Sequence, residues 1–123
     1  MEPIDKMKEK LAEIEAAAAI TYGANDIEPM LVELLTLIRG HPAERAGFED
    51  LFIDLIRRSP DGTVMILEFS MHTLRWEAVR KELESLRTNT EDFNIRRSVD
   101  RVLEAFNDDW ADADIYEFYS ESD

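Results

Sequence analysis

Carboxylates and aromatic rings are concentrated at the end of this chain. The last 22 residues, 102 to 123, hold eight acidic side chains, five aromatic rings and no Lys or Arg. Dense carboxylates attract cations, and Tyr and Trp are the side chains most often found as anchors in protein interfaces. The pattern therefore predicts docking onto a basic protein, with carboxylates pairing with its Lys and Arg side chains and rings filling its pockets.

Eight residues of this segment are the predicted contacts with a partner. They are Asp108, Asp109, Trp110, Asp112, Asp114, Tyr116, Glu117 and Tyr119. Two other interpretations stay open. A solvated, partly disordered tail would keep the protein soluble, and the rings could instead fold back and close one end of the core.

Three acids recur every four residues, at Glu104, Asp108 and Asp112. If the last helix continued past Asn107, they would project from one side at a spacing close to that of phosphates along a nucleic-acid strand. This predicts mimicry of a nucleic-acid backbone. An ordinary solvated helix face is the alternative.

The sequence contains few candidate catalytic residues. The two histidines are His41, expected in an exposed turn, and His72, one helical turn after Glu68. A Glu68–His72 contact is geometrically possible, but a hydrogen-bonded, partly buried histidine is the simpler expectation. No serine lies in a Gly-x-Ser-x-Gly context, and glycine is too sparse for a phosphate-binding loop. We therefore expect no catalytic residues and a protein that is not an enzyme.

Metal and cofactor sites are not expected either. The chain has no cysteine, and no second histidine is placed for a zinc or di-iron motif. The aspartates near the end do not form a calcium loop, because a loop starting at Asp112 has Glu117 where a glycine turn is required.

Composition limits the class of protein further. The chain has 123 residues, 45% of them hydrophobic, and a net charge of −14. This size predicts one domain with a real core, and the charge argues against direct nucleic-acid binding. The lack of cysteine, of a signal-like N-terminus and of any apolar run approaching the roughly 18 residues of a membrane span predicts a cytoplasmic protein that does not bind membranes.

Hydrophobic periodicity predicts the helices that must position these side chains. The expected helices cover residues 3–22, 26–39, 42–58, 64–74, 76–86 and 90–106. Asn25 or Asp26 and Thr90 are candidate N-caps, and Gly23, Gly40 and the turn at 59–62 are candidate stops. A strand at 64–69 is the alternative for the apolar run, but no partner strand is evident elsewhere.

The expected fold is all-α. We predict a single compact domain of five to six short helices, in an irregular helical bundle or a stacked array. Residues 1–106 form the helical domain, and residues 107–123 form an acidic, aromatic C-terminal segment that packs on this domain or extends it.

A short stretch, Leu67-Glu68-Phe69-Ser70-Met71-His72-Thr73-Leu74-Arg75-Trp76-Glu77, resembles a segment of small bacterial proteins encoded beside secreted toxins. These include immunity proteins of contact-dependent inhibition systems. The stretch carries no defining contact motif, so no family contact residues are transferred to this chain. The resemblance implies a cytoplasmic neutralising protein that binds a toxin nuclease and blocks its basic active site or a neighbouring exosite.

These observations predict a non-enzymatic immunity or inhibitor protein, a monomer or weak homodimer, that binds a basic toxin or nuclease domain. The alternative is a structural or adaptor module that self-associates or docks on a larger assembly through Ile4, Met7, Leu11 and Ile14 of the first helix. An enzyme that uses Glu68 and His72 is a third class, which would require further polar groups around His72 in a concave pocket.

Overall fold

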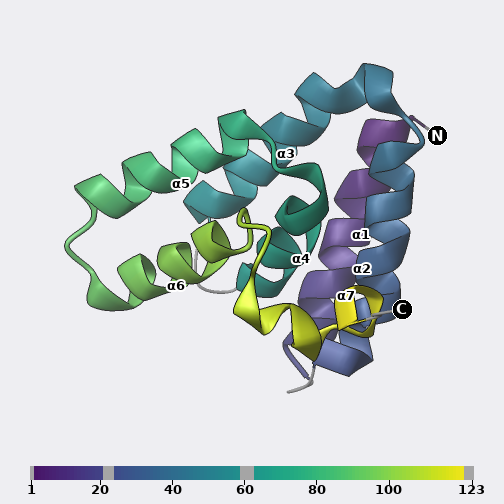
Figure 1. The fold of residues 1–123 in the computed structure, drawn as a ribbon. Helices are drawn as coiled ribbons and strands as arrows, with labels where there is room; N and C mark the ends of the chain where they lie inside the picture. Colours follow the sequence, from purple (N-terminus) through teal and green to yellow (C-terminus); the bar gives the residue numbers. More distant parts are fainter. Residues whose placement is uncertain (1, 21–23, 59–62, 121–123) are drawn as a thin grey trace. The chain divides into compact units, whose positions relative to one another are not determined.

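The computed structural model describes residues 2–20, 24–58 and 63–120, and throughout these ranges the prediction of an all-α fold is confirmed. The described residues form seven α-helices and two short 3-10 helices, with no strand (Figure 1). This is slightly more than the five to six helices predicted. In chain order the elements are α1 (Pro3–Ala18), α2 (Ala24–Arg39), η1 (Pro42–Glu44), α3 (Arg45–Arg58), α4 (Val64–Leu74), α5 (Glu77–Asn89), α6 (Phe93–Glu104), η2 (Ala111–Ile115) and α7 (Glu117–Ser120).

Contacts divide the chain into two compact units. The terminal unit comprises residues 1–48 and 111–123, and the central unit comprises residues 49–110. Helix α3 begins in the terminal unit and continues into the central one. The predicted division into a domain of residues 1–106 and a segment of residues 107–123 stays a prediction, as does the bundle or array arrangement.

The terminal unit is built on α1 and α2, which lie side by side (Figure 1). The predicted apolar stripe of α1 is buried at Met7, Leu11 and Ile14. Burial of this face removes its apolar area from water, which is the main favourable term in packing. These three side chains therefore pack in the chain's own core and are not exposed for self-association. The buried face of α2 comprises Ile27, Leu31, Leu34, Leu35 and Ile38.

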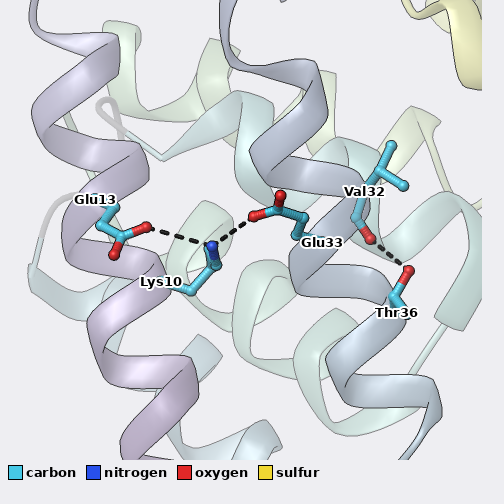
Figure 2. Close-up of polar contacts among 5 residues, drawn as sticks. All are labelled: Lys10, Glu13, Val32, Glu33 and Thr36. Atoms are coloured by element: carbon cyan, nitrogen blue, oxygen red, sulfur yellow. Dashed lines mark hydrogen bonds and ion pairs between the residues drawn. The ribbon is translucent and has the colours of Figure 1, made fainter.

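One lysine bridges the two helices on their outer side. Lys10 Nζ lies 2.6 Å from Glu33 Oε1 on α2 and 3.3 Å from Glu13 Oε1 on its own helix (Figure 2). The hydrogen bond to Glu33 raises the pKa of Lys10 above its usual value. Figure 2 also shows that Val32 lies on a different side of α2 from Glu33.

The central unit is organised by α4, which packs on α6, while α6 also packs on α5. Six consecutive residues of α4, from Ile66 to Met71, are buried. A helix that is buried all round belongs inside the fold, as predicted from its nearly continuous apolar sequence. The run at 64–69 is helical, so the strand alternative is wrong. Helix α4 ends at Arg75, whose backbone is left-handed with φ 50°.

Several helix ends differ from the predictions. Helix α1 stops at Ala18 rather than Tyr22, and α2 begins at Ala24, so Asn25 and Asp26 lie inside the helix instead of capping it. The third helix is preceded by η1, a separate 3-10 turn that begins at Pro42. The predicted stops at Gly23 and at residues 59–62 lie outside the described residues. Among the described helices, none is both long and apolar enough to cross a membrane.

The N-cap of α6 is Asp92 and not the predicted Thr90. Asp92 Oδ1 accepts hydrogen bonds from the backbone N–H groups of Asn94 at 2.8 Å and Ile95 at 3.3 Å. Thr90 lies two residues earlier, and its hydroxyl oxygen accepts the N–H of Asp92 at 3.1 Å. A carboxylate is favoured as the cap because it also complements the positive end of the helix dipole.

Replacing this cap should lower stability measurably. We expect Asp92→Ala to reduce the free energy of unfolding by about 1 kcal/mol, because two N–H groups lose their acceptor. Urea denaturation followed by circular dichroism measures this loss. Glu91→Ala, the neighbouring exposed acid, is the matched control, and equal effects of the two substitutions would contradict the assignment of the cap.

Candidate protein-binding surface

The acidic end of the chain does not continue α6. This helix ends at Glu104, and the N–H groups of Ala105 and Phe106 bond back three residues, to Val102 and Leu103, at 3.0 and 3.1 Å. Tight i to i−3 bonds of this kind end a helix instead of extending it. The prediction that Glu104, Asp108 and Asp112 form one helical row is therefore wrong, because the backbone turns before the second of them.

The predicted contact residues fall into the two units. Asp108, Asp109 and Trp110 belong to the central unit, whereas Asp112, Asp114, Tyr116, Glu117 and Tyr119 belong to the terminal unit.

In the central unit, the ring of Trp110 is buried. Only 5% of the residue is exposed, and its ring lies 4.8 Å from the imidazole of His72, centroid to centroid, with the planes at 50°. His72 is itself held by α6, because its Nδ1 donates to the carbonyl oxygen of Ala105 at 2.7 Å. Trp110 is thus part of the packing around the end of α4. Its ring is not displayed as an anchor for a partner, which corrects that part of the predicted surface.

Glu68 of α4 is fully buried and forms a bidentate ion pair with α6. Its two carboxylate oxygens accept from Nε and Nη2 of Arg101 at 3.0 and 3.1 Å. Arg101 compensates the charge of Glu68, which would otherwise be very costly to hold away from water. No local sequence pattern links Glu68 to Arg101, because 33 residues separate them. Glu68 and His72 each tie α4 to α6.

The two aspartates of this unit differ in their surroundings. Asp109 is exposed, and Asp108, 94% exposed, accepts a hydrogen bond from Nη1 of Arg75 at 2.5 Å. The bond from Arg75 lowers the pKa of Asp108 below its usual 3.8. Arg75 is held in place by a second bond, in which its Nε donates to the carbonyl oxygen of His72 at 3.0 Å. The charge of Asp108 is therefore partly neutralised within the chain.

In the terminal unit, a buried carboxylate on α2 holds the last helix. Glu28 is 7% exposed, and its two oxygens accept the backbone N–H groups of Glu117 at 2.9 Å and Phe118 at 2.6 Å. Charge-assisted bonds of this kind are stronger than neutral ones. The sequence places Glu28 directly after the buried Ile27, but it did not indicate a partner 89 residues away.

Side chains of η2 and α7 alternate between the core and the surface. Tyr116 is fully buried, whereas Ile115 and Phe118 on either side of it are 41% and 40% exposed. Tyr119 is half-buried, with its ring edge-to-face against Phe118 at 4.9 Å. The prediction of Tyr116 as an exposed anchor is therefore wrong, and Phe118, which the prediction omitted, is displayed in its place.

We give the name C-terminal surface to the acidic and large apolar residues of this segment that are exposed or half-buried. It comprises Asp112, Asp114, Ile115, Glu117, Phe118 and Tyr119. No basic residue occurs between 102 and the end of the chain. The terminal unit as a whole has 14 acidic and 5 basic residues, which gives −9 of the total −14. Within the described ranges, no cluster of ligating side chains suited to a metal ion occurs.

A cavity of about 300 Å³ adjoins the C-terminal surface. Its lining comes from α2, through Glu28, Pro29 and Val32, and from α7, through Glu117. Two carboxylate-bearing residues thus share one cavity with two aliphatic walls.

Comparisons with protein-family models, with curated proteins and with solved structures found no match to this chain.

Removing the charge of Glu28 should loosen α7. In Glu28→Gln one carboxylate oxygen becomes an NH₂ group, so one of the two N–H groups loses its acceptor and the other loses a charged one. We expect hydrogen exchange at Glu117 and Phe118 to quicken about tenfold or more, the equivalent of about 1.5 kcal/mol. Glu33→Gln, which changes an α2 carboxylate that pairs with Lys10 instead of with α7, is the control. Unchanged exchange in Glu28→Gln would show that these bonds do not hold the helix.

Titration of Asp108 tests its pairing with Arg75. We expect a carboxyl pKa below 3.8 by carbon NMR, and a return towards that value in Arg75→Met. Because folding lowers this pKa, the stabilisation is present above pH 3.8 and is lost as the pH falls through the depressed value. Arg80→Met, which removes an arginine paired instead with Glu84, should leave the pKa of Asp108 low.

Proposed function

We propose that this protein is a non-enzymatic inhibitor that binds a basic protein, of the toxin or nuclease-domain type, through its C-terminal surface. The observation that carries the proposal is the exposure of Ile115 and Phe118 beside carboxylates, in a segment anchored by buried Glu28. Two physical effects support it.

The first effect is electrostatic. Asp114 and Glu117 are exposed, Asp112 is half-buried, and the unit that carries them has a net charge of −9. Such a field accelerates encounter with a positively charged partner and repels nucleic acid. A nuclease or toxin domain that binds nucleic acid has the complementary charge, so an acidic surface can occupy the site where its substrate would lie.

The second effect is apolar anchoring on a preorganised segment. Carboxylates alone give fast association but little residence time, whereas a buried aromatic side chain slows dissociation. Phe118 and Ile115 provide apolar area, and the bonds from Glu28 to the backbone of α7 reduce the entropy lost when this segment is fixed in a complex. The anchors of the proposed surface are thus Ile115, Phe118 and the exposed part of Tyr119.

The resemblance of residues 67–77 to immunity proteins implies the same class of partner as the charge of the C-terminal surface. These residues lie in the central unit, and none of them is proposed as a contact. The adaptor alternative is not favoured, because Met7, Leu11 and Ile14 of its docking stripe are buried.

Affinity capture with the full chain tests the proposal. We expect the wild-type protein to retain a basic protein that Ile115→Ala/Phe118→Ala does not retain. With the captured partner, Phe118→Ala should speed dissociation about tenfold, and Asp114→Asn should slow association about twofold and reduce its salt dependence. Biolayer interferometry at two salt concentrations measures both rates.

Matched controls come from the central unit. Phe93→Ala removes an exposed phenylalanine, 67% accessible, and Glu91→Gln removes an exposed acid, so both changes should leave the rates unaltered. Retention of an acidic or neutral partner, or equal effects of Phe93→Ala and Phe118→Ala, would overturn the proposal.

A further inference from the structure

We infer that the cavity between α2 and α7 receives an arginine side chain of the basic partner. This inference rests on the proposed function and adds to it the chemistry of one specific contact. It starts from the cavity lining, which is Glu28, Pro29, Val32 and Glu117.

Glu28 supplies a buried negative charge that the chain itself does not neutralise. It is 7% exposed, and its oxygens accept two neutral backbone N–H groups. No ion pair joins Glu28 to a basic side chain in the part of the chain that the structure describes, in contrast to Glu68, which is paired with Arg101. Each carboxylate oxygen has a second lone pair, so Glu28 can accept a further donor without releasing α7.

Glu117 places a second carboxylate beside the same cavity. Its backbone N–H is held by Glu28, while the residue itself is exposed. A cationic group that enters this cavity from a partner therefore meets carboxylate-bearing residues of both α2 and α7.

The aliphatic walls select the kind of cation. Pro29 and Val32 offer apolar surface to the methylene stem of a long basic side chain, whose charged end can then reach the carboxylates. Inorganic cations have no stem to make this contact. Between the two basic side chains, arginine is favoured, because its planar group offers five donors and is more weakly hydrated than the ammonium of lysine.

The inference is tested by NMR with a small probe, so that no partner is needed. The ¹⁵N-labelled full chain is titrated with N-acetyl-arginine amide, with its uncharged analogue N-acetyl-citrulline amide, and with N-acetyl-lysine amide. We expect arginine to shift the amide signals of Val32, Glu117 and Phe118 with saturation at millimolar concentration, lysine to bind more weakly and citrulline not to bind. A probe this small buries little surface, so an affinity of about 1 mM is expected.

Paired substitutions locate the binding. Val32→Phe fills the cavity without changing charge and should abolish the shifts, whereas Thr36→Phe, one turn along α2 and outside the lining, should preserve them. Glu117→Gln should weaken binding about two- to fivefold, the range of an exposed ion pair, and Glu33→Gln should not weaken it. Circular dichroism checks folding, and Glu117→Gln, at an exposed site, decides the matter if Val32→Phe does not fold.

Several results would overturn the inference. These are equal shifts with citrulline and arginine, tighter binding of lysine than of arginine, shifts scattered over all exposed acids, or unchanged binding in Glu117→Gln. The proposed function fails separately. A basic partner whose affinity is unchanged by Val32→Phe would overturn the arginine cavity alone, while saturable arginine binding without any basic protein partner would overturn the proposed function.

Discussion

The buried carboxylate of Glu28 is the interaction on which the candidate surface depends. It lies on the inner part of α2, and it accepts two N–H groups of a four-residue helix at the other end of the chain. So short a helix has no stability of its own, because nucleation costs more than a few hydrogen bonds return. The position of α7, and with it the exposure of Phe118 and the burial of Tyr116, therefore follows from contacts with α2 and η2.

Polar side chains also connect the helices of the central unit. Glu68 joins α4 to Arg101 of α6, and His72 donates to the carbonyl oxygen at the end of α6. Acidic residues in this chain thus serve two purposes. Some lie within apolar helix faces and hold distant segments together, whereas others are exposed and generate the field of the surface. The net charge does not distinguish between them, because both kinds are formally negative.

This division changes how the acidic end of the chain is understood. Two of its rings, Trp110 and Tyr116, are part of the packing, and Asp108 is paired within the chain. The surface available to a partner therefore includes fewer residues than the sequence suggests. It consists of two exposed apolar side chains, carboxylates of the same segment and an adjoining cavity lined in part by a buried acid. A small, preorganised patch loses less entropy on binding than a flexible acidic tail would.

The spacing of apolar residues along each helix was enough to predict the helical class, the bounds of α4 and the buried faces of α1 and α2. It did not determine that Asp92 caps α6, since neighbouring polar residues compete for that role and backbone geometry selects one. Tertiary structure alone decided which rings at the C-terminal end are buried. Residues 111–115 form a 3-10 turn too short to show a periodic apolar face, and the helix that follows Tyr116 packs on α2, far away in the chain, so local spacing did not indicate that Tyr116 is buried. The partners of Glu28 and Glu68, which lie 89 and 33 residues away, were decided in the same way, because local spacing carries no information about contacts at such separations.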